Sequence, residues 1–164
     1  MTLLLRPIDV FDHQAALELL ALQIISYEIE AKRIGFEQAP PLSDSFQTLQ
    51  RSKETFIGCY EEGKLIGAAS FKESADEATI CRMMVHPDHF RRGVATMLLL
   101  EMERRIGPHL TIHVPAGTRN EPAMSLYLKH GYVPENEVLV ARGITITMLV
   151  KRRNAGRQEA DRRT

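Results

Sequence analysis

The chain has 164 residues, of which 44% are hydrophobic and 26% are charged, and this composition suits one globular domain with a substantial core. Its formal net charge is zero, so no overall field favours a nucleic acid or an anionic membrane as partner. The charge is uneven, because residues 151–164 carry a net +4 and residues 1–150 a net −4. We expect a folded domain over residues 1–150 and a basic, flexible tail over residues 151–164, which lacks the aromatic residues that stack on bases.

The cysteines and the N-terminus bear on where the protein works. Cys59 and Cys81 lie in apolar stretches, which favours buried, reduced thiols over a disulfide scaffold. The N-terminal Leu-Leu-Leu run is too short for a signal peptide, and no apolar run approaches the roughly 20 residues of a membrane helix. We therefore expect a soluble, cytoplasmic protein.

The spacing of apolar residues changes along the chain between a helical and a strand-like period. Helical spacing is found over residues 11–33, 93–106 and 122–129 and, in a short helix, from Ser43 or Asp44 to residue 51; strand-like runs cover residues 2–6, 55–60, 65–72, 78–85, 110–114, 137–143 and 144–150. Neither a repeat nor a long linker interrupts this order. The expected fold is α/β, with a single mixed, mostly antiparallel sheet of six to seven strands and helices on both faces.

The stretch from Val85 to Arg105, VHPDHFRRGVATMLLLEMERR, places two arginines and a glycine at the beginning of a helix. The first N–H groups of a helix have no partner within the helix, and the helix dipole adds positive charge there. Phosphate groups bind at such positions. Gly93 and Ala95 keep side chains small, and Arg91 and Arg92 can add charged hydrogen bonds. The pattern predicts an anion-binding loop.

Two other kinds of site are disfavoured. The stretch GCYEEGKL matches part of a P-loop pattern, but Leu65 stands where a magnesium-binding Ser or Thr is needed, and the segment is predicted to be strand, turn and strand. His86 and His89 are three residues apart, but Pro87 lies between them, and we expect no helix there. Because no Cys/His cluster completes a ligand set, we predict no metal site.

Two stretches together resemble the signatures of the GNAT superfamily of acyl-CoA N-acyltransferases. The loop before the long helix resembles the pattern [Q/R]-x-x-G-x-[G/A] after V-x-P, although Phe90 occupies the Gln/Arg position. The later stretch NEPAMSLYLKHGYV resembles N-x-x-A-x-x-L-Y-x-K-x-G-F, with Tyr132 in place of Phe. The order of the expected elements also fits this family, so the resemblance covers about residues 2–150.

The resemblance implies an N-acetyltransferase that moves an acetyl group from acetyl-CoA to a primary amine of a small molecule or peptide, by direct attack in a ternary complex and without a metal. It implies that Tyr127 protonates the leaving thiolate and that Asn120 contacts the cofactor or a water, although Asn120 could equally be a plain helix cap. The cofactor-binding residues implied are Met84, Val85, Arg91, Arg92, Gly93, Val94, Ala95, Thr96, Asn120 and Tyr127.

Several points stay open at the level of the sequence. The general base could be Glu77, His86 or a water. Residues 23–41 lie where this family builds its acceptor pocket; Tyr27, Phe36 and Phe46 could line that pocket or simply pack, and Glu28, Glu30 or Glu37 could attract a cationic amine. A catalytically weak acyl-CoA-binding module or sensor is the alternative function. The acceptor, the physiological acyl group and the formation of a homodimer are undetermined.

Overall fold

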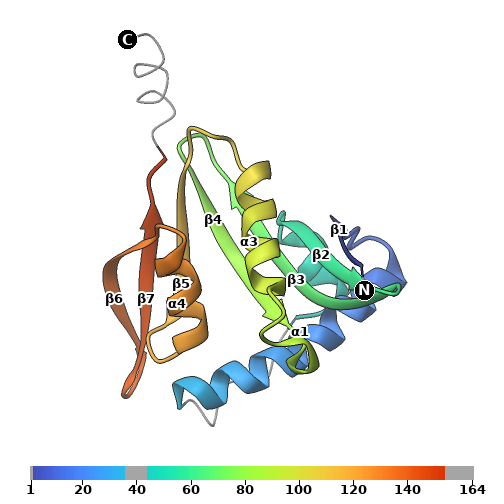
Figure 1. Cartoon of the computed structure of the whole chain (residues 1–164), viewed down its shortest axis with the longest axis horizontal. Coiled ribbons are helices and arrows are strands. Elements are labelled where there is room, and N and C mark those ends of the chain that lie inside the picture. The colour runs from blue at the N-terminus through green and yellow to red at the C-terminus, as the bar shows by residue number, and fades with distance from the viewer. Residues whose placement is uncertain (1, 36–43, 154–164) are drawn as a thin grey trace.

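The structure is a computed structural model that describes residues 2–35 and 44–153. Seven strands form one sheet in the order β1-β2-β3-β4-β5-β7-β6 (Figure 1). The strands are β1 (Leu3–Pro7), β2 (Thr55–Glu61), β3 (Lys64–Glu73), β4 (Glu77–Val85), β5 (Thr111–Gly117), β6 (Val133–Ala141) and β7 (Ile144–Lys151), and the helices are α1 (His13–Ile34), α2 (Phe46–Arg51), α3 (Val94–Arg105) and α4 (Glu121–Lys129). Every strand pair is antiparallel except β4 with β5. The predicted fold class is confirmed.

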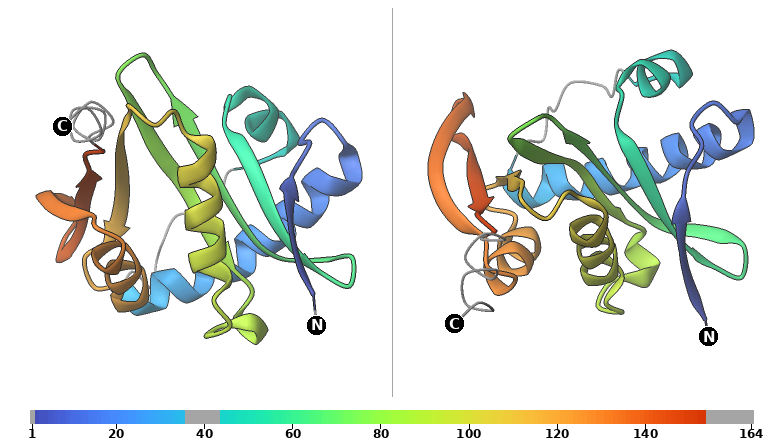
Figure 2. Two further views of the ribbon diagram at one scale, coloured as in Figure 1. Left: turned by 45° about the horizontal axis from the view of Figure 1, so that its top comes forward. Right: turned by 90° about the horizontal axis from the view of Figure 1, so that it is seen from above.

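Helices cover both faces of the sheet, and each face has its own hydrophobic core. Figure 2 shows α3 and α4 on one side and α1 on the other. Leu98, Leu99 and Met102 of α3 pack into the larger cluster, whereas Leu19 of α1 and Leu49 of α2 belong to the second. Because both faces are covered, the central strands are buried over almost their whole length, which explains their nearly continuous apolar runs.

Two segments that were expected to be loops are regular structure. β5 continues through Pro115 to Gly117, where its edge toward β4 has no strand partner, so the missing N–H of Pro115 breaks no ladder on that side. Pro87–His89 forms a short 3₁₀-helix, since the His86 side chain caps it and Pro87 suits a first helical position. The prediction that this segment is not helical was therefore wrong.

The beginning of the segment expected as a flexible tail is part of the domain. Lys151 ends β7, and the Arg153 guanidinium donates hydrogen bonds to the carbonyl oxygens of Glu103 at 2.9 Å and of Ile106 at 3.3 Å. These carbonyls lie at the C-terminal end of α3, where the helix dipole favours a cation. Residues 154–164 lie outside the described residues.

Arg82 on β4 joins four parts of the chain. Its guanidinium binds the Glu54 carboxylate twice, at 2.9 and 3.0 Å, and reaches Asp44 at 3.0 Å and the side-chain oxygen of Gln23 at 2.6 Å. Only 11% of the Arg82 side chain and 5% of the Glu54 side chain are exposed. Burial by itself raises the pKa of Glu54, but the hydrogen bonds and charge of Arg82 together bring that pKa below its usual value. For Asp44, burial also raises the pKa, but hydrogen bonds from Thr48 and Gln23 and the charge of Arg82 together bring it below its usual value.

Replacing Arg82 by Met should lower the free energy of unfolding at neutral pH by about 3 kcal/mol, because it leaves buried carboxylates without their counter-charge. The wild-type protein should also lose stability on acidification. The depressed pKa values of Glu54 and Asp44 provide stability that is complete above their unfolded values of about 4 and disappears as the pH falls through the folded values. Urea unfolding between pH 7 and pH 2.5 measures both effects.

Arg104→Met is the matched control, because Arg104 pairs with Glu101 on the surface and 69% of its side chain is exposed. It should change the free energy of unfolding by no more than about 0.5 kcal/mol. Equal destabilisation by the two substitutions would contradict a central role for Arg82.

Candidate functional site

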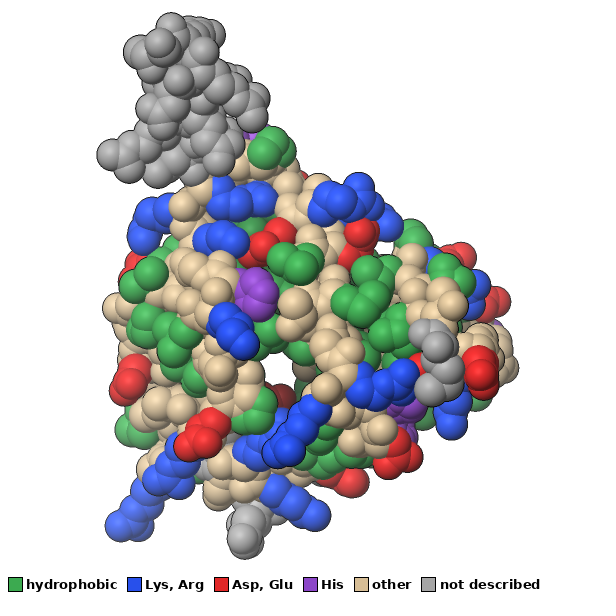
Figure 3. Space-filling model, in the orientation of Figure 1, with side chains coloured by type: hydrophobic (Ala, Val, Ile, Leu, Met, Phe, Trp, Pro, Cys, Tyr) green, Lys and Arg blue, Asp and Glu red, His purple; other side chains and the backbone are tan. Residues whose placement is uncertain are grey.

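The only parallel strand pair observed in the described residues, β4 with β5, separates soon after it begins. It is joined by Glu77 with Thr111, Ala78 with Ile112 and Thr79 with His113. Beyond these pairs the strands diverge, and the gap widens toward the end at which α3 begins (Figure 1). The space-filling view shows a hollow in this region, with Lys and Arg side chains around its lower rim (Figure 3). Residues 80–85 of β4 therefore present a backbone edge that β5 does not occupy.

The loop before α3 has the backbone of an anion-binding site. Gly93 is the N-cap in the left-handed region with φ of 79°, and Arg91 is also left-handed with φ of 63°. No side chain caps the helix, and the first hydrogen bond that we observe there runs from the Met97 N–H to the Gly93 carbonyl. Within the described residues, no acceptor meets the N–H groups of residues 94–96. A Cβ at Gly93 would find no atom within 4 Å, so the approach to these groups is open.

The two arginines of this loop have different surroundings. Arg92 forms a bidentate ion pair with Glu61 of β2, and its Nη1 also lies 2.7 Å from the Nδ1 of His89. The hydrogen bond from Arg92 lowers the pKa of Glu61. Arg91 has no ion-pair partner in the part of the chain that the structure describes. Arg91 therefore has a freer side chain than Arg92 for binding an anion, a difference that the sequence pattern does not indicate.

Met84 and Val85 lie where β4 approaches the loop. Met84 is fully buried opposite Ala68 of β3, and Val85 is half-buried opposite Gly67. Both side chains pack into hydrophobic clusters, one on each face of the sheet. Packing uses their side chains, so the backbone edge of β4 is left for another interaction.

Tyr127 and Asn120 lie on the other side of the gap, on and just before α4. The Asn120 side chain caps α4 by accepting a hydrogen bond from the Ala123 N–H at 3.4 Å. Tyr127 is only 3% exposed, and its ring packs edge-on against Tyr132 at 5.6 Å. Among the described residues, its hydroxyl has no hydrogen-bond partner. Burial raises the pKa of Tyr127, and the nearby charge of Glu30 raises it further.

The end of α1 lies against both sides of the gap. The Arg33 guanidinium sits 5.0 Å from the ring centre of Phe90 in the loop before α3. A side-chain carbon built on Gly35, which ends α1, would lie 3.2 Å from Nη1 of Arg119 in the segment before α4. Glu30, one turn before Arg33, is half-buried. Burial raises its pKa, and the Asn120 side chain and Arg33 partly offset that rise.

Other predicted candidates lie elsewhere. Glu77 is at the closed end of the gap, beside His113 at 2.9 Å and roughly 25 Å along β4 from the loop. His86 uses its Nδ1 to accept a hydrogen bond from the Asp88 N–H. Tyr27 and Phe46 pack against the core on the α1 side of the sheet, which is the packing role considered for them above. Glu28 is exposed. Phe36 and Glu37 lie outside the described residues.

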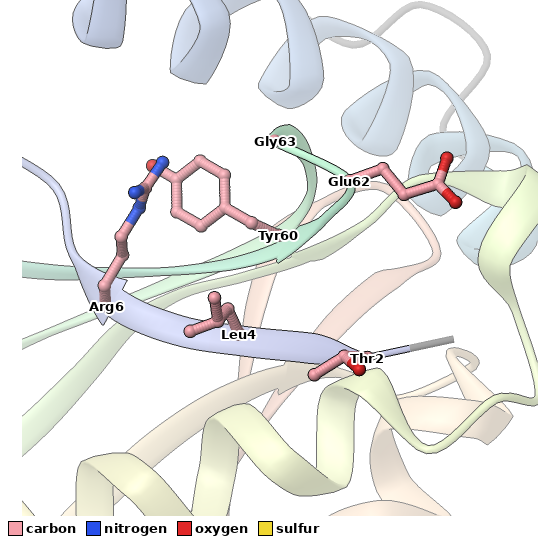
Figure 4. Close-up of a pocket in the computed structure, with 6 residues that line it drawn as sticks. All are labelled: Thr2, Leu4, Arg6, Tyr60, Glu62 and Gly63. Atoms are coloured by element: carbon pink, nitrogen blue, oxygen red, sulfur yellow. The ribbon is translucent and has the colours of Figure 1, made fainter.

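A separate shallow pocket opens at the β1 edge of the sheet (Figure 4). It is lined by Thr2, Leu4, Arg6, Tyr60, Glu62 and Gly63. The Arg6 guanidinium lies over the Tyr60 ring at 4.0 Å. This pocket contains none of the predicted site residues. No group of His, Cys, Asp or Glu among the described residues could hold a metal ion, and no helix there is long and apolar enough to cross a membrane.

Known proteins match this chain in sequence and in structure. A family model described as the acetyltransferase (GNAT) family matches residues 19–132. The UPF0157 protein YqkA of Bacillus subtilis is 35% identical over 144 residues, which cover 86% of this chain but 42% of that protein. In the cysteine-rich protein 2-binding protein of mouse, 65 residues are 38% identical, covering 39% of this chain and 8% of that one. The chain thus spans less than half the length of the curated relatives it matches.

Solved structures share the fold. The PaiA N-acetyltransferase of Thermoplasma acidophilum in complex with coenzyme A has a TM-score of 0.71 at 19% identity, covering 93% of this chain and 99% of that one. The ribosomal-protein-S18-alanine N-acetyltransferase of Escherichia coli has a TM-score of 0.70 at 17% identity, covering 92% and 94%. Together with the family match, which covers more than half of the residues, these findings show that the chain belongs to the GNAT family of acetyltransferases.

Proposed function

We propose that this protein is an N-acetyltransferase that transfers an acetyl group from acetyl-CoA to a primary amine of a small molecule or peptide. The observation that carries the proposal is the gap between β4 and β5, which has an open helix start on one side and α4, the helix that carries Tyr127, on the other. A thioester placed in this gap would meet an anion-binding backbone and a proton donor at the same time.

The loop and β4 suit the two chemical parts of coenzyme A. Free N–H groups at the start of α3 and the open space at Gly93 fit a pyrophosphate, with Arg91 adding charge. We assign this role to the backbone from Arg91 to Thr96. The edge of β4 at Met84 and Val85 can pair with the amides of pantetheine as an added strand would. Arg92 contributes mainly by holding the loop to Glu61.

The residues across the gap suit the chemistry of acyl transfer. Bound acetyl-CoA supplies the thioester, whose C–S bond breaks as the amine forms its C–N bond. Tyr127 donates a proton to the leaving sulfur, since a phenol carries its proton at neutral pH. Positioning of both reactants in the gap supplies much of the acceleration. Asn120 caps the start of α4 and so helps to fix the position of Tyr127 on that helix.

A panel of primary amines and peptides, assayed for release of free CoA from acetyl-CoA, tests the proposal. The E. coli relative acetylates an alanine of a ribosomal protein, as its name states, so peptides with an N-terminal alanine belong in the panel beside small amines. Release of CoA that depends on one amine class supports an enzyme. Tight binding of acetyl-CoA without release in the presence of any amine would instead identify an acyl-CoA sensor.

Gly93→Ala should weaken acetyl-CoA binding about tenfold or more, because a methyl group would enter the space that the pyrophosphate approaches. Gly143→Ala is the matched control, since Gly143 has φ of 75° and open space in the β6–β7 turn. Both substitutions should cost about 1 kcal/mol of stability from the left-handed backbone. Calorimetry should show lower affinity only for Gly93→Ala, and equal affinities would argue against the loop.

Tyr127→Phe should reduce turnover by roughly 100-fold while changing acetyl-CoA affinity by no more than a few fold, because the hydroxyl acts mainly in the transition state. Its stability should change little, since no described residue bonds to that hydroxyl. Tyr132→Phe is the control: its hydroxyl donates to Glu103 at 2.8 Å, so it should lose stability and keep its turnover. Unchanged turnover of Tyr127→Phe would show that the sulfur obtains its proton elsewhere.

A further inference from the structure

We propose that Glu30 of α1 is the carboxylate that binds the ammonium group of the acceptor and removes its proton before attack. This inference rests on the proposed function. It assigns the general base to Glu30 instead of to Glu77 or His86. It also predicts the chemical class of the acceptor, which is a primary amine that arrives as a cation.

The first observation is where α1 ends. The Arg33 guanidinium lies over Phe90, and Gly35 leaves room for Arg119, whose Nη1 would lie 3.2 Å from a side-chain carbon at that position, so the last turns of α1 lie against both sides of the gap. Figures 1 and 2 show the later part of α1 passing beneath the open end of that gap. An acceptor that reaches the thioester from this direction meets α1 first. Glu30 lies one turn before Arg33, within this part of the helix.

The second observation is the set of polar groups around Glu30. Asn120 uses its side-chain oxygen to cap α4, which leaves its amide nitrogen for another acceptor, and the Asn120 side chain partly offsets the rise that burial causes in the pKa of Glu30. Burial raises the pKa of Tyr127 on α4, and the charge of Glu30 raises it further. The proposed base, Glu30 on α1, and the predicted acid, Tyr127 on α4, thus influence each other across the two helices. Such a pair on two elements is what acid–base catalysis of acyl transfer needs.

The third observation is the charge balance. Glu30 is half-buried, yet no ion pair to it occurs among the described residues. Tyr27 and Arg33 on its own helix and Tyr127 on α4 are the titratable groups that interact with it, and Arg33 is the one cation among them. Arg33 lies over Phe90 rather than forming an ion pair with Glu30. A partly buried carboxylate without a close counter-ion attracts a cation, and an ammonium group would fill that position.

The proton transfers balance as follows. Glu30 takes one proton from the ammonium group, and the neutral amine nitrogen attacks the thioester carbon. The C–N bond forms, the C–S bond breaks, and Tyr127 gives its proton to the sulfur. The amide nitrogen loses its second proton to Tyr127, which is thereby restored, and Glu30 releases its proton to solvent. The raised pKa of Glu30 makes it a stronger base than an exposed carboxylate.

The test compares Glu30→Gln with wild type, using the amine identified by the screen. Glutamine keeps the shape of the side chain and its capacity for hydrogen bonds but has no charge. We expect kcat/KM to fall about 100-fold at neutral pH and the loss to shrink at high pH, where the amine is already neutral. Acetyl-CoA affinity, measured by calorimetry, should stay within about threefold of wild type. Glu28→Gln is the control, because Glu28 is exposed on the same helix and should behave like wild type.

The inference would be overturned by a Glu30→Gln enzyme with an unchanged pH profile, or by a loss of acetyl-CoA affinity that accounts for the lost turnover. A second readout does not require turnover. NMR can measure the binding of alaninamide and of butylamine to the CoA-bound protein. Binding to wild type and its loss in Glu30→Gln would support a cation site even if the proposed acetyl transfer fails. Equal binding to both proteins, or no binding to wild type, would overturn the cation site.

Discussion

The position of α1 depends on the buried guanidinium of Arg82. This one group on β4 holds Glu54 at the start of β2, Asp44 before α2 and Gln23 of α1, so it ties both helices of one face to the centre of the sheet. Removing any partner would leave a charge or a polar group in a largely buried place, where the penalty is high. The remaining partners therefore keep α1 in one register along the sheet.

That register matters because α1 borders the place where β4 and β5 part. A parallel pair that ends after a few residues leaves two backbone edges facing each other, and no described strand fills the space. The edge of β4 can accept a ligand that pairs like a strand, while β5 tolerates Pro115 on its free side. The same separation sets α3 apart from α4, so the proposed phosphate loop and the proposed acid, Tyr127, approach a ligand from opposite sides.

The charged side chains that already have ion-pair partners are not available to the proposed substrates, and those without partners are. Arg92 is bound to Glu61, so the proposed phosphate contacts depend on the backbone and on Arg91. Glu30 lacks a close counter-ion among the described residues, so it is suited to a cation on the acceptor side. The end of α1 carries both Glu30 and the Arg33 that covers Phe90, and it therefore forms a shared boundary between the two halves of the site.

Local sequence patterns were enough to predict the order of the elements, the fold class, the helix start at Gly93 and the family resemblance, because periodicity, caps and turn glycines act over a few neighbouring residues. Asp12 and Asn120 cap their helices, and Gly35 ends α1 in the left-handed region, through contacts of this local kind. Three further facts depend on tertiary contacts: Arg92 has a partner, Glu77 lies at the closed end, and Glu30 is half-buried whereas Glu28 is exposed. Those facts arise from contacts between residues far apart in the chain, and local spacing contains no information about where the parallel strands separate.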